Sequence, residues 1–188
     1  MATKRKAAAR KSSPRTPQRG NGPGPNLQPI HPCLWFDNQA EDAAKFYVSI
    51  FKNGKILNVS RYPAVGQEVH GRAPGSVMVA EFTLNGLTFT ALNGGPLFKF
   101  NEAISLQIMC QTQDEIDYYW EKLTAGGDAK AQACGWLKDK YGLSWQVVPT
   151  GMAKMLKDPK SPATERAFAA MMKMKKLDIA ALRKAYKG

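Results

Sequence analysis

Hydrophobic and polar residues alternate along this chain with two different periods, which separate strands from helices. Apolar residues at helical spacing follow Asn38 and Thr112, and each of these polar residues has a glutamate three positions later, as in a capping box. Asn85-Gly86 separates two strand patterns and predicts a hairpin, because these residue types accept positive φ. The strand patterns cover residues 31–36, 56–62, 76–84, 87–93, 103–110, 130–138 and 143–148.

The order of these predicted elements repeats once along the chain. The second cap spacing follows the first after 74 residues, and the apolar stripe of the helix recurs after 73 residues. Each half therefore reads as strand, helix and further strands, which indicates an internal duplication. The stretch from Gly86 to Cys110 forms the seam between the halves, and we expect the polar side of its strands to face a pocket.

Composition divides the 188 residues into three parts. Residues 1–29 are rich in Lys, Arg and Ala and then in Ser, Pro, Gly and Asn, so they predict a disordered basic tail. The strand and helix patterns place a folded domain over residues 30–150. Helical patterns after Pro149 predict a helical extension over residues 151–188, beginning near a Ser161-Pro162 cap and ending in a helix after Asp178.

Charge is concentrated at the start of the chain. The formal net charge is +12, and residues 1–29 supply +7 of it without a single acidic residue. This segment predicts weak, non-specific contact with nucleic acid, although a solvated tail is the simpler interpretation. The three cysteines have no metal-site spacing and indicate reduced thiols in a cytoplasmic protein. No apolar run reaches the roughly 20 residues of a membrane span, so no membrane contact is expected.

Five segments resemble the PhnB-like group of the glyoxalase/bleomycin-resistance/dioxygenase (vicinal oxygen chelate) superfamily, a group that carries the label 3-demethylubiquinone-9 3-methyltransferase. They are PCLWFDNQAEDAAKFYVSIF, the RYP…GSVMVAEF…NG segment, FTALNGGPLFKFNEAISLQI, CGWLKDKYGLSWQVVPT and MMKMKKLDIAALRKAY. The resemblance covers residues 30–188. It implies an α+β fold in which two βαβββ-type modules form a curved mixed sheet around a cavity, with C-terminal helices and frequent dimerisation.

The same resemblance bears on metal binding. Enzymes of the superfamily hold a divalent metal with two His and two Glu, and the alignment places these positions at His31, Ala91, Ala103 and Gln146. Alanine has no donor atom, and a neutral amide is a poor replacement for a carboxylate. We therefore expect neither a catalytic metal nor another cofactor.

The alignment also assigns two faces to the strands. The core face receives Leu34, Phe36, Leu92, Leu106, Ile108, Trp145 and Val147. The concave face mixes aromatic, small and neutral polar residues, as a small-molecule pocket does, with a solvated open sheet face as the alternative. Besides Ala91, Ala103 and Ser144, it carries the eight residues that we take as the candidate pocket: His31, Cys33, Trp35, Phe89, Asn93, Ser105, Gln107 and Gln146.

The sequence thus predicts a glyoxalase-like protein that binds an unidentified small organic molecule as a homodimer, without the usual metal. Whether it catalyses a reaction stays open, and no catalytic residue is assigned. One alternative is a metal-dependent lyase or dioxygenase, or a methyltransferase as the family label states. Against the last, Gly94-Gly95-Pro96 opens no helix and so lacks the context of a methyl-donor site. The other alternative is a nucleic-acid-associated protein acting through residues 1–29.

Overall fold

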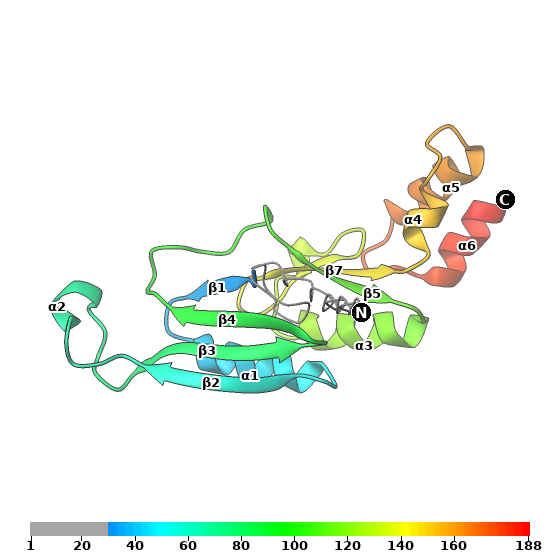
Figure 1. Cartoon of the computed structure of the whole chain (residues 1–188). Coiled ribbons are helices and arrows are strands. Elements are labelled where there is room, and N and C mark those ends of the chain that lie inside the picture. Colours follow the sequence, from blue (N-terminus) through cyan, green and yellow to red (C-terminus); the bar gives the residue numbers. More distant parts are fainter. Residues whose placement is uncertain (1–29) are drawn as a thin grey trace, which may run out of the picture. The chain divides into compact units, whose positions relative to one another are not determined.

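The computed structural model describes residues 30–188, and the predicted basic tail lies outside them. Two β-sheets, helices that pack on them and a helical C-terminal segment make up this part (Figure 1). The first sheet and its helices comprise β1 (Cys33–Phe36), α1 (Ala40–Ile50), β2 (Lys55–Arg61), α2 (Gln67–His70), β3 (Val77–Leu84) and β4 (Leu87–Asn93). The remaining elements are β5 (Leu106–Cys110), α3 (Gln113–Thr124), a 3-10 turn (Ala129–Ala131), β6 (Trp136–Lys138), β7 (Ser144–Pro149), α4 (Met152–Met155), α5 (Pro162–Met171) and α6 (Ile179–Lys187).

The two sheets share one topology. The first has the strand order β1-β4-β3-β2 and the second β5-β7-β6. In each, the first and last strands of the module pair in parallel, whereas the remaining pairs are antiparallel. The predicted α+β class with two modules of the βαβββ type is confirmed, and the second module has one strand fewer than the first.

The internal repeat is visible in the buried positions. Leu34 and Phe36 of β1 correspond, 74 residues later, to Ile108 and Cys110 of β5, and all four are buried. In the helices, Ala43 and Ile50 of α1 correspond, 73 residues later, to Ile116 and Leu123 of α3. The connection between strand and helix is therefore one residue shorter in the second module.

Within the two modules, the predicted turn and one of the two predicted helix caps are confirmed. Asn85 has φ 48° and Gly86 φ 84°, as a two-residue primed turn requires. Thr112 forms the complete capping box of α3 with Glu115. The predicted cap at Asn38 is wrong, because α1 begins one residue later and has no side-chain cap from its N-cap residue.

A residue distant in sequence replaces that missing cap. The backbone amide of Ala40 donates to Oδ1 of Asn93 over 2.8 Å, so the end of β4 caps the first turn of α1. Asn93 also donates through Nδ2 to the carbonyl of Val77 over 3.0 Å. Such a tertiary cap satisfies an orphan amide as a local cap does, but it leaves no local spacing in the sequence.

The largest differences from the predicted boundaries are at two strands. The strand expected over residues 103–110 begins at Leu106, after a turn in which Asn101 Oδ1 accepts from the amide of Ala103. Only Trp136–Lys138 of the strand expected over 130–138 forms, because Cys134 and Gly135 have φ of 51° and 87°, outside the extended region. Residues 63–75, which lie between two of the predicted strands, contain the single turn α2.

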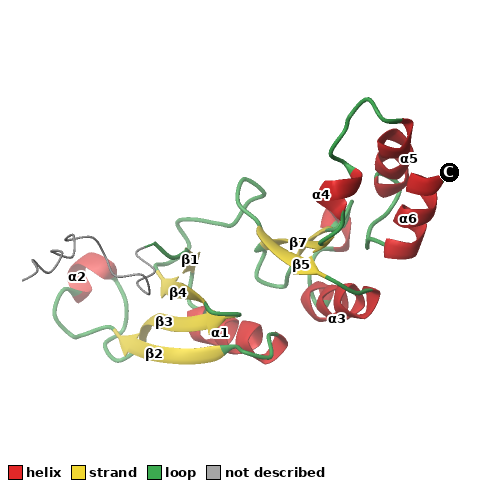
Figure 2. Ribbon diagram, turned by 45° about the vertical axis from the view of Figure 1, so that its right-hand side comes forward, coloured by secondary structure: helices red, strands yellow, loops and turns green. Residues whose placement is uncertain are grey.

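A core shared by both modules lies beneath the sheets. Helix α1 packs against β3 and β4, and α3 packs against β5 and β7 (Figure 2). The buried carboxylate of Asp139 joins the two halves, since it accepts from the hydroxyl of Tyr47 in α1 and from Nε1 of Trp145 in β7. The core residues predicted on β1, β5 and β7 are buried, except Leu106, which is half-buried.

The C-terminal helices are held to α3 through one amide side chain. Gln113 donates through Nε2 to the carbonyl of Leu177 over 3.1 Å and accepts, through Oε1, from the amide of Ile179 over 2.9 Å. Asp117 lies beside it and forms an ion pair of 2.6 Å with Lys176. Hydrogen bonds from Lys176 and Gln113 lower the pKa of Asp117.

Replacing Gln113 by alanine is expected to loosen the segment before α6. The substitution removes two hydrogen bonds between α3 and residues 177–179 and leaves the Ile179 amide without this acceptor, a loss of about 2 kcal/mol. Hydrogen exchange should show faster exchange in α5 and α6 while the strand amides stay protected. Equal changes in hydrogen exchange across all elements would contradict the role of Gln113 in holding this segment.

The neighbouring ion pair adds a pH dependence. Since the folded pKa of Asp117 is lowered, the stability that its ion pair with Lys176 contributes is present at neutral pH and lost as the pH falls through that pKa.

Charge is distributed unevenly over the described residues. Residues 30–150 contain ten Lys or Arg and twelve Asp or Glu, whereas residues 151–188 contain ten and three. Residues 30–150, which form the two modules, therefore carry a net charge of −2, and the helical extension carries a net charge of +7. Within residues 30–188, none of the helices has the length and apolar character needed to cross a bilayer.

Candidate functional site

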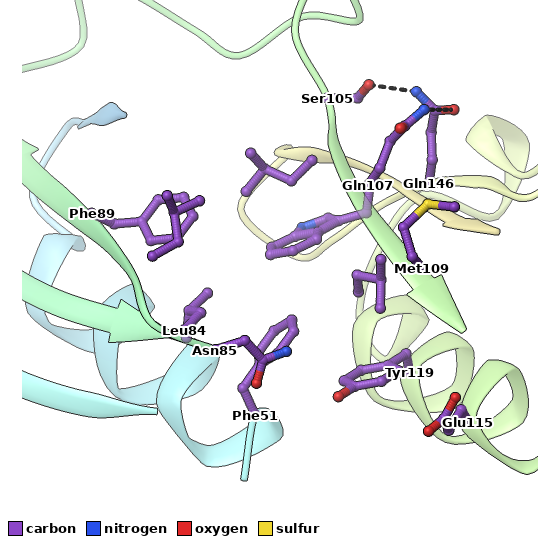
Figure 3. A pocket seen from close by; sticks show the side chains of 14 residues that line it. Phe51, Leu84, Asn85, Phe89, Ser105, Gln107, Met109, Glu115, Tyr119 and Gln146 are labelled. Atoms are coloured by element: carbon purple, nitrogen blue, oxygen red, sulfur yellow. Dashed lines mark hydrogen bonds between the residues drawn. The ribbon is translucent and has the colours of Figure 1, made fainter. Parts of the chain in front are cut away.

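A cavity of about 710 Å³ lies between β5 and the β3–β4 hairpin, above the end of α1 and helix α3 (Figure 3). Cavities of this size hold small organic ligands in many proteins. Both modules contribute to its walls, so the cavity exists only when the two halves pack together. Its lining consists of Phe51, Leu84, Asn85, Leu87, Phe89, Ser105, Leu106, Gln107, Ile108, Met109, Glu115, Tyr119, Trp145 and Gln146.

Three neutral polar side chains form a hydrogen-bonded chain on one wall of this cavity (Figure 3). Nε2 of Gln107 donates to Oε1 of Gln146 over 3.1 Å, and Nε2 of Gln146 donates to Oγ of Ser105 over 2.7 Å. The parallel pairing of β5 and β7 places Gln107 directly opposite Gln146. The chain leaves the Ser105 hydroxyl proton and the Gln107 carbonyl oxygen available, so it can donate to one ligand atom and accept from another.

The rest of the cavity is apolar or aromatic and carries little charge. Among residues 30–188, Glu115 is the one carboxylic acid in its lining, and no Lys, Arg or His of this range lines it. Oε2 of Glu115 already accepts from the amides of Gln111 and Thr112, over 2.6 and 3.3 Å, as part of the α3 cap. The cavity therefore offers an anionic ligand no cation to pair with.

Four of the eight candidate residues meet in this cavity. Ser105, Gln107 and Gln146 lie on the exposed face of the second sheet, as the alternation predicts, and Phe89 reaches the cavity from β4. Their role in binding stays a prediction. Ser144, which alternates with Gln146, is buried and does not line this cavity.

A second group of candidate residues lies on the first sheet and away from the lining of this cavity. Nε2 of His31 is 3.1 Å from the hydroxyl oxygen of Thr90. Cys33 follows on the same face, and partial burial raises the pKa of its thiol, which disfavours the thiolate. Trp35 lies further along β1 and donates through Nε1 to the carbonyl of Gly95 over 2.8 Å.

The faces predicted for β4 are wrong. The register pairs Leu34 with Ala91 and Phe36 with Asn93, so Phe89, Ala91 and Asn93 belong to the buried face beneath which α1 packs. Leu92, predicted in the core, shares the opposite face with Trp35. Strong alternation fixes which residues share a face, but not which face is covered, and here both faces of β4 carry apolar residues.

Two of the residues whose face was predicted wrongly make specific contacts within the core. Asn93 caps α1 and is 5% exposed, and Phe89 stacks on Phe82 with ring centroids 5.3 Å apart. Phe89 nevertheless reaches the cavity, whereas Asn93 lines a smaller hollow beside Arg72.

The donor set at the expected metal positions does not fit a divalent metal. The β4 residue beside His31 is Thr90, since Ala91 lies on the opposite face. Ala103 precedes β5, and Gln146 is engaged with two other neutral side chains. Over residues 30–188, no three His, Cys, Asp or Glu side chains come together as metal ligands.

Several cavity residues were not anticipated from the sequence. Met109 follows Gln107 by two residues on β5, so strand alternation alone could have added it. Tyr119 belongs to the apolar stripe of α3, which indicated core packing rather than a cavity wall. Leu84 and Asn85 carry only a hairpin signal, and their position against β5 depends on tertiary packing.

Comparison with known proteins finds one family model and several solved structures that are similar to this chain. The family model described as 3-demethylubiquinone-9 3-methyltransferase matches residues 28–148. A search of curated proteins found no match. The crystal structure of the PhnB protein from Bacillus cereus is 36% identical, covers 65% of this chain and 99% of its own, and has a TM-score of 0.57.

Two more distant structures complete the comparison. The fosfomycin resistance protein FosX from Listeria monocytogenes, complexed with Mn(II) and sulfate, is 17% identical, with 70% of this chain and 97% of its own covered and a TM-score of 0.46. A possible glyoxalase from Bacillus cereus is 12% identical, with 65% and 99% covered and a TM-score of 0.44. From the family match and the PhnB protein, we conclude that this chain belongs to the 3-demethylubiquinone-9 3-methyltransferase family, the PhnB-like group that its sequence resembles.

Proposed function

We propose that this protein binds a small, uncharged organic molecule in the cavity between its two modules, independently of a metal. The observation that carries this proposal is the Ser105–Gln146–Gln107 chain set in an otherwise apolar cavity of about 710 Å³. Apolar walls supply affinity through burial, and a few fixed polar groups orient the bound molecule. A flat molecule with one hydrogen-bond donor and one acceptor suits this arrangement.

The methyl transfer named in the family label receives no support from the connection after β1. A nucleotide-type methyl donor is held by a glycine-rich turn between a first parallel strand and its helix. Here β1 is joined to α1 through Asp37, Asn38 and Gln39, without a glycine. We therefore propose binding without assigning a reaction.

None of the described residues that line the cavity is a cation, and this leads to a testable preference between two fluorescent probes. N-Phenyl-1-naphthylamine is neutral, and 8-anilinonaphthalene-1-sulfonate adds an anionic group to the same ring system. We expect the neutral probe to bind at least about tenfold more tightly, because the sulfonate would be desolvated without a partner. Fluorescence titration measures both affinities, and tighter binding of the sulfonate would contradict a site for uncharged molecules.

Substitution of Gln146 by methionine tests whether the polar chain belongs to the site. Methionine keeps the length of the side chain but removes both hydrogen bonds, so neutral probe binding should weaken by about threefold to tenfold. The matched control is Gln67→Met on the exposed turn α2, which lines none of the cavities described. An equal affinity of both variants for the probe would remove Gln146 from the site.

We further propose a cytoplasmic homodimer, supported by the resemblance and by the half-exposed Leu87 and Met109 beside the cavity. Native mass spectrometry of protein from cell extract would report the subunit number together with any retained molecule. A mass increase lost in Gln146→Met but kept in Gln67→Met supports the cavity. A monomer would overturn the dimer alone, and a retained divalent metal ion would overturn independence from metal.

The charge of the two ends favours non-specific nucleic-acid binding as a second candidate. Residues 1–29 and 151–188 each carry a net +7, and the part between them is slightly acidic. Binding through phosphate neutralisation falls steeply with salt. Anisotropy titration of duplex DNA at several salt concentrations tests this candidate, and salt-independent or absent binding would dismiss it.

A further inference from the structure

A second pocket, of about 320 Å³, lies at β1 and the segment that follows β4, and it shares no lining residue with the first cavity. Among the described strands, β1 forms an edge of its sheet, since it pairs with β4 alone. Four residues after β4 and the turn at Tyr141 complete the pocket; the four are Pro96, Phe98, Lys99 and Phe100. Five aromatic rings dominate its lining: Trp35, Phe36, Phe98, Phe100 and Tyr141.

The indole ring of Trp35 is held in place from two sides. Its Nε1 donates to the carbonyl of Gly95 over 2.8 Å. A Cβ atom on Gly94 would lie 2.2, 2.3 and 2.4 Å from three atoms of the indole ring, so the ring rests with its face against the glycine backbone. The Trp35 wall is therefore formed before any ligand arrives, which lowers the entropic cost of binding.

The other rings stand at steep angles to their neighbours. The Phe98 ring is tilted 74° to Trp35 with centroids 4.9 Å apart. Phe36 meets Phe100 at 73° and Tyr141 at 89°, with centroids 5.2 and 5.9 Å apart. Rings arranged at such angles make an angular pocket whose walls combine π-faces and ring edges.

Two charged groups of the described part of the chain line this pocket, and they have opposite signs. Asp37 provides a carboxylate whose side chain is 43% exposed and whose Oδ1 lies 3.4 Å from Nη2 of Arg72. Lys99 provides an ammonium on a flexible, exposed side chain. Nearby, the Lys140 ammonium lies 4.3 Å from the centroid of the Phe46 ring and 5.2 Å from that of Tyr141. A cation thus already occupies an aromatic surface at the border of this pocket.

We infer that the pocket formed by Trp35, Phe98 and Asp37 binds a small organic cation of the quaternary ammonium class. The π-faces of aromatic rings attract an N-methylated ammonium group, and such a group needs no hydrogen-bond acceptor. Asp37, which also pairs with the Arg72 guanidinium, supplies a negative charge at the edge of the aromatic wall, and Lys99 opposes it. This binding is independent of the proposed function, because the two cavities have separate linings.

The test compares choline with its neutral isostere 3,3-dimethylbutan-1-ol, which has the same shape without the charge. Titration calorimetry of the full chain should show saturable choline binding and at least about tenfold weaker binding of the isostere. Equal affinities would reduce the site to an apolar pocket, and no saturable choline binding would overturn the inference. Probe binding in the first cavity should be unchanged by choline.

Variants that remove a charge from the pocket should change choline affinity in opposite directions, depending on the sign of the charge removed. Asp37→Asn should weaken choline binding about threefold to tenfold, whereas Lys99→Gln should strengthen it by a similar factor. Phe98→Ala removes an aromatic wall that is 59% exposed, so it should weaken choline binding without unfolding the chain. Asp114→Asn on the exposed first turn of α3 is the matched control, and near-ultraviolet circular dichroism verifies folding of each variant. An unchanged choline affinity of Asp37→Asn would refute the role of this carboxylate.

Discussion

Replacing Asp139 by alanine is expected to destabilise the folded protein by about 4 kcal/mol, the largest effect of any substitution considered. This carboxylate is 2% exposed and accepts four hydrogen bonds. Two come from side chains, the Tyr47 hydroxyl over 2.9 Å and Trp145 Nε1 over 2.8 Å. Two come from the backbone amides of Tyr141 and Leu143, over 2.9 and 3.1 Å.

The large loss follows from what the substitution leaves behind. Alanine removes one acceptor group but abandons four donors in a core where water cannot replace it, and each unsatisfied donor costs about 1–3 kcal/mol. A domain of this size is stabilised by about 5–15 kcal/mol, so much of the margin would disappear. The Tyr47 bond also joins α1 of the first module to the β6–β7 turn of the second, so we expect the modules to loosen against each other.

Urea denaturation followed by circular dichroism measures this effect. Tyr47→Phe is the matched control, because it removes one of the four donors together with its hydroxyl and should cost only about 1–1.5 kcal/mol. An Asp139→Ala variant no less stable than Tyr47→Phe would contradict the view of Asp139 as the acceptor that joins the modules.

The protonation of Asp139 adds a pH dependence of defined sign. Burial raises the pKa of this carboxyl in the folded protein, and the four hydrogen bonds oppose that rise only in part. A group whose folded pKa exceeds its unfolded value contributes stability that is fully present below the unfolded pKa and is lost as the pH rises through the folded one. The Asp139→Asn variant lacks this contribution. As the pH rises from the unfolded to the folded pKa of Asp139, the stability of the variant should therefore fall less than that of the original protein.

Replacing Gly94 by alanine is expected to cost about 3 kcal/mol and to displace Trp35. The added Cβ would lie 2.2 Å from the indole ring, which is fixed by its bond to the carbonyl of Gly95. Relief requires the ring to turn away, and that movement breaks the bond. Urea denaturation measures the stability, and the indole N–H region of an NMR spectrum, with four tryptophans in the chain, reports the change at Trp35.

A second glycine provides the comparison for this prediction. Gly151 has φ −75°, and the nearest atom to an added Cβ there is the flexible end of Met155 at 3.8 Å. Gly151→Ala should therefore cost less than about 1 kcal/mol and leave all indole signals in place. Equal costs at both glycines, or an unmoved Trp35 signal in Gly94→Ala, would show that the ring is not held as described.

Local pattern was sufficient for much of the fold. The Asn85-Gly86 hairpin and the Thr112 capping box depend on residues within four positions of each other, so short-range chemistry specifies them. The repeat at 73 to 74 residues survives in the buried positions, because each module must cover its own sheet with its own helix. Family resemblance then supplied the arrangement of modules that periodicity alone could not.

Pattern was insufficient where a distant residue decides the outcome. Asn38 has the spacing of a cap, yet Asn93 performs that function from β4, 53 residues away from Ala40. The faces of β4 were inverted for a related reason. Apolar residues occupy both sides of this strand, and only the register with β1 shows that Ala91 and Asn93 lie against the helix.

Local sequence patterns were enough to predict the repeat and the shared face of Ser105, Gln107 and Gln146, since strand alternation and turn chemistry are local properties. Tertiary structure alone decided that these three side chains form one cavity with the β3–β4 hairpin while His31, Cys33 and Trp35 lie elsewhere. It also placed Asp139 at the junction of the modules and Trp35 against Gly94. These contacts join residues tens of positions apart, and their distances are set by packing, which no local period records.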